Sequence, residues 1–149
     1  MKLDFNKGSP WRTEKIVLPQ HADHAGVMWH GAYISWLEES RVDALQKAGL
    51  NYYELSATGI EMPVVSLTID YKNVLKHGDR VVLNSWFLGK QGVRFTWLSS
   101  FILQDSDLLA AKAKVELVLV DRSAKKLKLI KNTPTYLQVV FERLRKEAD

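Results

Sequence analysis

The residues of this chain that could perform chemistry concentrate in one stretch, residues 20–33, with the sequence QHADHAGVMWHGAY. The stretch contains three of the four histidines, His21, His24 and His30, and one aspartate, Asp23. Because imidazole is a common metal ligand, histidines at this density suggest a metal site. The alternatives are a carboxylate-based catalytic site and a polar turn that happens to be rich in histidine.

The spacing of these histidines argues against a metal. His21 and His24 could converge on one ion only if their segment were helical, and Ala25-Gly26 favours a loop. A mononuclear site needs at least three convergent ligands, and the HExxH pattern of metallohydrolases is absent. The chain also lacks the GxSxG elbow of serine hydrolases. We therefore predict neither a metal ion nor a serine nucleophile.

The carboxylate of Asp23 offers a different chemistry, because its loop runs into a predicted long helix. The first turn of a helix has backbone N–H groups without intrahelical partners and a partial positive charge. A carbonyl oxygen held there would be stabilised as it becomes an oxyanion. Asp23 could then attack the carbonyl carbon or activate a water molecule. The alternative is that Asp23 only caps the loop or the helix.

Hydrophobic periodicity predicts the elements around this loop. Helical spacing indicates one long helix over about residues 31–48, and Gly49 stands where a helix-ending glycine belongs. A short strand is expected at 12–18, and a connector with one helical turn at 51–60. Thr133-Pro134 would begin a C-terminal amphipathic helix. Alternating residues between turns predict four further strands, at 62–71, 80–88, 93–103 and 108–121, with a hairpin turn at 89–92.

These elements predict an α+β protein of one domain, residues 1–149. Short turns between the strands favour an antiparallel meander with the long helix covering one face. No apolar run is long enough to span a membrane, and the start MKLDFNKGSPW lacks the apolar region of a signal peptide. Cysteine is absent, which excludes a disulfide framework and a thiolate nucleophile. We therefore expect a cytoplasmic protein.

Residues 23–33, DHAGVMWHGAY, resemble the D-x-x-G-[IV]-V-[YF]-[HYF]-x-N-Y signature of the 4-hydroxybenzoyl-CoA thioesterase family. The resemblance continues through Trp36–Arg41 (WLEESR) and covers roughly residues 12–121. His30 is similar to the histidine that acyl-CoA thioesterases associated with bacterial Tol–Pal gene clusters have here. The resemblance implies the hotdog fold, an antiparallel sheet wrapped around one long central helix, with a C-terminal helix in addition.

The resemblance also implies an activity, the hydrolysis of an acyl-CoA to the free acid and coenzyme A. Asp23 would be the nucleophile or general base, and the backbone N–H of His30, with that of Gly31, would polarise the thioester carbonyl. The acyl group would be aromatic, such as hydroxybenzoyl or dihydroxynaphthoyl, or short and aliphatic. No cofactor is implied, since coenzyme A is part of the substrate. The sequence departs from the signature at Ala32, where the family usually has Asn, and at His24.

Further residues are expected to bind the substrate. Four apolar side chains are candidates for the acyl pocket, although such residues are often simply core: Met28, Trp29, Met62 and Val64. From Ala111 onward the chain has ten Lys/Arg against five Asp/Glu, which suits an anionic ligand. Basic candidates for the phosphates of coenzyme A are Lys112 and Lys114, or Lys125, Lys126 and Lys128.

Expected partners are the acyl-CoA substrate and further copies of the chain. The resemblance implies a homodimer or homotetramer with active sites between protomers. No nucleic-acid binding is expected, because the basic residues lack interleaved exposed aromatics in a clear motif. Two other functions stay open: a non-catalytic module that binds acyl-CoA or an acyl carrier, and a hotdog dehydratase or hydratase.

Overall fold

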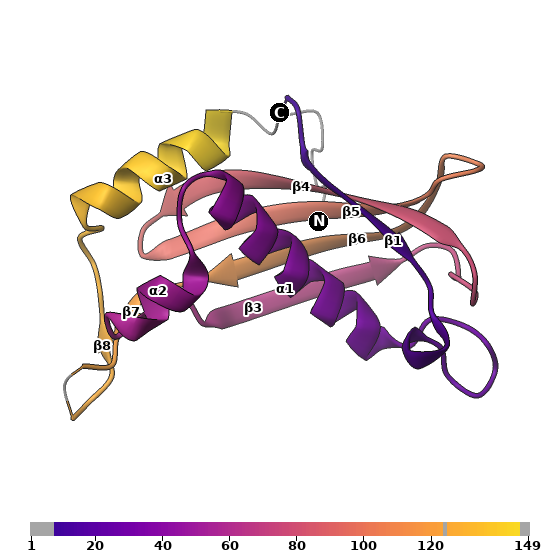
Figure 1. Cartoon of the computed structure of the whole chain (residues 1–149), viewed down its shortest axis with the longest axis horizontal. Helices are drawn as coiled ribbons and strands as arrows, with labels where there is room; N and C mark the ends of the chain where they lie inside the picture. The colour runs from indigo at the N-terminus through magenta and orange to yellow at the C-terminus, as the bar shows by residue number, and fades with distance from the viewer. Residues whose placement is uncertain (1–7, 124, 147–149) are drawn as a thin grey trace.

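The main feature of the computed structural model is a five-stranded antiparallel sheet with one long helix lying across it (Figure 1). The structure describes residues 8–123 and 125–146. Helix α1 spans His30–Lys47. The strands of the sheet, in spatial order, are β1 (Trp11–Ile16), β4 (Arg80–Gln91), β5 (Arg94–Leu103), β6 (Leu108–Leu117) and β3 (Val64–Tyr71). This architecture confirms the predicted hotdog fold.

Smaller elements lie at the two ends of α1. A 3₁₀ turn, η1, precedes α1 in the chain, and a small three-stranded sheet lies beyond its C-terminal end (Figure 1). That sheet has the order β2-β7-β8. The bounds are η1 Pro19–His21, α2 Tyr52–Ala57, β2 Ile60–Glu61, β7 Val120–Asp121, β8 Lys128–Leu129 and α3 Thr135–Lys146. None of the helices in the described part of the chain is long and apolar enough to span a membrane.

The strand order corrects the predicted meander. Strands β4, β5 and β6 do follow one another, but β3 pairs with β6 at the far edge of the sheet. The place beside β4 is taken by β1, which pairs with it from Trp11 opposite Ser85 to Ile16 opposite Arg80. The connection over residues 72–79 therefore crosses from β3 at one edge of the sheet to β4, the strand next to the other edge. This crossing brings it past the loop that precedes α1.

Two predicted strand ends were also wrong. Strand β4 does not stop at Leu88 but runs to Gln91, and Gly89 lies at a register shift inside it. Strand β6 stops at Leu117, and the chain then enters the small sheet as β7. Both regions continue with strand-forming residues past these points, so the sequence pattern alone could not reveal a bulge or a change of sheet.

Helix α1 packs closely on the sheet and is fixed at its C-terminal end. Ser40 on α1 forms a hydrogen bond of 3.2 Å with Ser85, so a small residue allows close approach. At the end of α1, Gly49 has a φ of +101°, and the guanidinium of Arg143 on α3 donates to the carbonyl of Ala48. The C-terminal end is thus covered by α3, and the loop that contains Asp23 precedes the N-terminal end.

Candidate active site

The loop that contains Asp23 is held by the connection between β3 and β4. The N–H of Met28 donates to the carbonyl of Leu75 at 2.7 Å, and the N–H of His77 donates to the carbonyl of Gly26 at 3.1 Å. Gly26 has a φ of +80°, which closes a turn with its N–H on the carbonyl of Asp23. The crossing connection therefore fixes the loop in front of α1.

One oxygen of the Asp23 carboxylate orders this loop. Its Oδ1 accepts the N–H of Ala25 at 2.8 Å and the N–H of Val27 at 3.3 Å. Its Oδ2 has no hydrogen-bond partner among the residues that the structure describes, and the side chain is exposed. Asp23 thus caps its own loop, which was the alternative to a catalytic role. It also keeps one oxygen available for a ligand.

The N-terminus of α1 offers free backbone donors beside this carboxylate. The residue before the helix is Trp29, whose indole has no acceptor atom to cap the first turn. The N–H groups of His30 and Gly31 therefore have no intrahelical partner and no side-chain cap. Gly31 matters for packing as well, because a methyl group at its Cα would overlap the Trp29 ring.

Asp23 and the first turn of α1 open onto one cavity of about 500 Å³. Loop and helix contribute Asp23, Met28, Trp29, His30 and Tyr33 to its wall. The opposite wall is the end of β3 and the start of the crossing connection, with Tyr71, Lys72, Asn73 and Val74. The arrangement suits attack on a carbonyl carbon whose oxygen lies at the helix N-terminus.

Two tyrosines in this wall are held in the neutral state. The Tyr33 ring is buried and meets the rings of Tyr71 and Phe101 edge-on at centroid distances of 5.0 and 5.1 Å. Burial, followed by the neighbouring Tyr71, raises the pKa of Tyr33 to about 12. Burial also raises the pKa of Tyr71. Both phenols therefore keep their protons at neutral pH and add no charge to the cavity.

Comparison with known proteins identifies the family. Residues 17–140 match the model of the thioesterase-like superfamily. The chain belongs to this superfamily. Membership confirms the family and the enzyme class, a thioester hydrolase, that the sequence predicted.

Similar proteins agree with this assignment. The protein sll0410 of Synechocystis sp., provisionally named an esterase, is 32% identical over 129 residues, which are 87% of this chain and 76% of that protein. YneP of Bacillus subtilis, provisionally named an acyl-CoA thioesterase, is 27% identical over 83% of this chain and 89% of its own. The crystal structure of the 1,4-dihydroxy-2-naphthoyl-CoA thioesterase of Synechocystis has a TM-score of 0.79 at 21% identity, covering 88% and 94% of the two chains.

The residues that were predicted to bind the substrate do not all line the same cavity. Met28 and Trp29 line the cavity of Asp23, but Met62 and Val64 line a second cavity of about 260 Å³. That cavity adjoins the C-terminal half of α1, where Arg41 and Leu45 contribute to its wall. Within one protomer, the predicted acyl pocket is therefore divided between two ends of the helix.

The predicted lysines on β6 lie away from both cavities. Ala111, Ala113 and Val115 of this strand are buried towards α1, so Lys112 and Lys114 project from the other face of the sheet. The ammonium of Lys114 is 3.4 Å from the carboxylate of Glu116. The basic residue in the wall of the Asp23 cavity is instead Lys72, which the sequence gave no reason to select.

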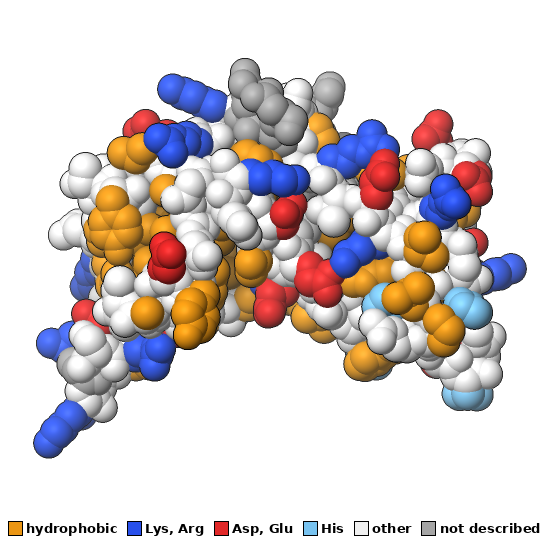
Figure 2. All heavy atoms as spheres, in the orientation of Figure 1, with side chains coloured by type: hydrophobic (Ala, Val, Ile, Leu, Met, Phe, Trp, Pro, Cys, Tyr) orange, Lys and Arg blue, Asp and Glu red, His pale blue; other side chains and the backbone are white. Residues whose placement is uncertain are grey.

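The histidines have separate positions at this end of the molecule (Figure 2). The Nδ1 of His21 accepts the N–H of Leu18 at 3.0 Å, and its ring meets the Trp36 ring edge-on. His24 is exposed, and the His30 ring stands beside Trp29. Among the described residues, no three His, Asp or Glu side chains converge in a way that could hold a metal ion.

Proposed function

We propose that this chain is an acyl-CoA thioesterase that hydrolyses aromatic acyl-CoA substrates with Asp23 and the N-terminus of α1. The observation that carries this proposal is that Asp23, a carboxylate with one free oxygen, and His30, the first residue of a helix whose first turn has no side-chain cap, line one cavity. The substrate class is supported by the structural similarity to a 1,4-dihydroxy-2-naphthoyl-CoA thioesterase. A short aliphatic acyl group is the second candidate.

In this mechanism the thioester oxygen accepts the N–H groups of His30 and Gly31. Asp23 then has one of two roles. As a general base it removes a proton from water, which attacks the carbonyl carbon; as a nucleophile it forms an acyl-aspartyl anhydride that water hydrolyses. Either route breaks the C–S bond and gives a carboxylic acid and the thiol of coenzyme A. A thiolate leaves readily, so this small set of groups is sufficient.

The site becomes complete in a dimer formed through β3. This strand lies at the edge of the sheet, and apolar side chains on it are exposed, Val64 by 45% and Tyr71 by 52%. An uncovered apolar edge strand invites pairing with another strand, and a two-fold axis near its centre would join two sheets antiparallel. Such pairing places Val64 of one protomer beside Tyr71 of the other.

This pairing also unites the two cavities. Tyr71 lines the Asp23 cavity, and Val64 lines the second cavity. Each composite site would therefore contain Asp23 from one protomer, with Met62 and Val64 from its partner. The predicted acyl pocket, which is divided within one chain, becomes a single pocket in the dimer.

The phosphates of coenzyme A would bind at the rim of this composite site. Lys72 is the cation in the Asp23 cavity wall. The segment that contains Lys125, Lys126 and Lys128 extends past the β3 edge (Figures 1 and 2), so the partner's lysines would flank the same rim. If these cations bind the nucleotide, the KM for an acyl-CoA should rise with salt, and the KM should be higher for a pantetheine thioester of the same acid, which lacks the nucleotide phosphates. A salt-independent KM, equal for both substrates, would leave these lysines without this role.

The activity itself is tested by release of free thiol from a panel of aromatic and aliphatic acyl-CoA thioesters. A thioesterase releases thiol from at least one member in a catalytic manner. A binding module would bind acyl-CoA and release none, and a hydratase would instead add water to an enoyl-CoA without releasing thiol. The preferred acyl group is read from kcat/KM across the panel.

The composite site is tested by mixing two inactive variants. Asp23→Asn removes the carboxylate, and Val64→Arg fills the pocket from a position that is half exposed in the protomer. In a mixed dimer, one of the two sites has Asp23 from one chain and Val64 from the other, so it is intact. Random exchange of equal amounts should restore about a quarter of the wild-type activity. No recovery in exchanged mixtures would show that each site lies within one chain.

A further inference from the structure

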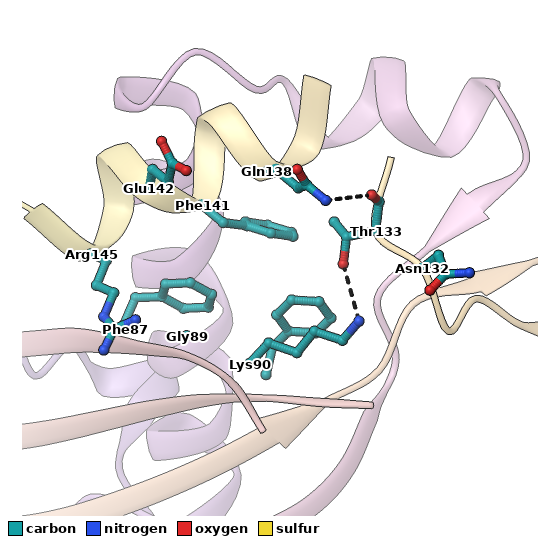
Figure 3. A pocket seen from close by; sticks show the side chains of 10 residues that line it. Phe87, Gly89, Lys90, Asn132, Thr133, Gln138, Phe141, Glu142 and Arg145 are labelled. Atoms are coloured by element: carbon teal, nitrogen blue, oxygen red, sulfur yellow. Dashed lines mark hydrogen bonds between the residues drawn. The ribbon is translucent and has the colours of Figure 1, made fainter. Parts of the chain in front are cut away.

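A third cavity, distinct from the two described above, lies at the other end of α1 from Asp23, between α3 and the ends of β4 and β5 (Figure 3). Its volume is about 360 Å³, within the range of small-molecule sites. Helix α3 forms one side of this cavity. Arg143 of α3 donates to the carbonyl of Ala48, which holds α3 at the C-terminal end of α1. The proposed acyl-CoA site makes no use of this cavity.

Three phenylalanines form the apolar wall of the cavity. Phe87 and Phe95 come from the sheet and Phe141 from α3. The Phe141 ring is 4.9 Å from the Phe95 ring and 5.5 Å from the Phe87 ring, measured between centroids. The rings pack on one another and are nearly buried, with exposed fractions of 4% for Phe87, 2% for Phe95 and 7% for Phe141, so only their edges at the cavity give an apolar wall against which another ring can pack.

A free guanidinium lies at one side of this wall. The register shift at Gly89 makes room for Arg145, whose Nη1 would be 3.5 Å from a Cβ at that glycine. Within the described part of the chain, this guanidinium has no hydrogen bond and no ion pair. Glu142 also borders the cavity, but its carboxylate points away from the rings (Figure 3). The planar guanidinium is therefore open to an anion.

A second cation stands at the other side. The ammonium of Lys90 donates to the carbonyl of Lys131. It also donates to the hydroxyl of Thr133 (Figure 3). It is also 5.9 Å from the centre of the Phe95 ring. Both hydrogen bonds go to neutral oxygens, so the positive charge of Lys90 is not neutralised by a carboxylate. Two cations thus flank one aromatic surface.

We propose that this cavity binds a small aromatic carboxylate, with its ring on the phenylalanines and its carboxylate on Arg145. Guanidinium and carboxylate match as planar groups that form two parallel hydrogen bonds. A cavity of roughly 150 Å³ already holds benzene, so this one has room for a substituted ring and its carboxylate. The site is separate from Asp23, and its existence does not depend on the proposed thioesterase activity.

Binding is measured in solution by fluorine NMR titration of 4-fluorobenzoate, and of a fluorinated naphthoate as the larger probe. The protein is the full wild-type chain, because the probes are free acids that a thioester hydrolase does not turn over. Arg145→Gln should weaken binding at least about tenfold, because it removes a charge-assisted pair. Lys146→Gln on the same helix, outside the cavity wall, is the matched control and should leave the Kd unchanged.

A neutral analogue and a variant of the apolar wall test the same proposal independently. The neutral analogue 4-fluorobenzyl alcohol should bind at least about tenfold more weakly than the carboxylate. Phe141→Leu should weaken both probes through the apolar wall, and unchanged melting of Arg145→Gln would show that its effect is not unfolding. Equal Kd values for Arg145→Gln and Lys146→Gln, or equal binding of alcohol and carboxylate, would overturn the proposal.

Discussion

Replacing Asp23 by asparagine separates the two functions of this side chain, ordering the loop and providing a reactive oxygen. The loop depends on Oδ1, which accepts the N–H groups of Ala25 and Val27. An asparagine oxygen can accept the same two bonds, and its amide nitrogen takes the place of Oδ2, which has no partner in the described residues. The free energy of unfolding of the variant should therefore lie within about 0.5 kcal/mol of the wild-type value, as for most surface substitutions.

The catalytic effect should be much larger. The amide is a poor nucleophile and cannot accept a proton at neutral pH, so kcat should fall by about 10²–10⁴. The assay is thiol release under saturating substrate, with thermal unfolding measured on the same samples. Asp23→Ala is the control: it should lose activity and also about 1–2 kcal/mol of stability, because two backbone donors lose their acceptor. An Asp23→Asn variant within threefold of wild-type kcat, which is about 0.65 kcal/mol in barrier, would refute a catalytic role for this carboxylate.

Four other outcomes are expected. Gly31→Ala should lower kcat/KM by about ten- to a hundredfold and shift tryptophan fluorescence, because the new methyl group displaces the Trp29 ring. His30→Ala should cost less than about fivefold in kcat, since its backbone N–H remains; a loss as large as that of Asp23→Asn would implicate the imidazole. Because the pKa of Tyr33 is about 12 rather than 10.0, the stability it contributes is complete below pH 10 and is lost as the pH rises through about 12. Tyr33→Phe should remove that part of the alkaline decline in urea unfolding, and a decline identical to that of the wild type would contradict it. Treatment with a chelator should leave thiol release unchanged, whereas inactivation reversed by zinc would revive the metal hypothesis.

The sequence predicted the helices and most strands because their hydrophobic patterns are local. Helix α1 begins at His30 and ends at Lys47, close to the predicted bounds of 31 and 48. Strand order is not local, since the pattern of β3 is the same whether it pairs with β4 or with β6. The bulge at Gly89 was equally hidden, because Gly89-Lys90-Gln91-Gly92 has the residues of a single hairpin turn.

In the candidate site too, residues close together in the sequence were predicted and residues from distant segments were not. Asp23, Met28, Trp29 and His30 are close in sequence and lie around one cavity, as expected. Tyr71 and Lys72 were missed, because they lie at the end of β3 and just after it, far from Asp23 in the sequence. Met62 and Val64 were predicted for the acyl pocket, and within one chain they lie at another cavity. No pattern in a single sequence reports which residues meet across a two-fold axis.

The contacts of the crossing connection indicate how assembly and chemistry are divided in the proposed dimer. Its start is fixed within the protomer, because the N–H groups of Lys72 and Asn73 both donate to the carbonyl of Ala110 on β6. Its middle then holds the Asp23 loop through the hydrogen bond from Met28 to Leu75. The carboxylate is therefore positioned by one chain alone, and the partner would contribute walls for the acyl group. On this reasoning, loss of the dimer removes substrate binding while the loop itself stays folded, which makes a raised KM the first sign of dissociation.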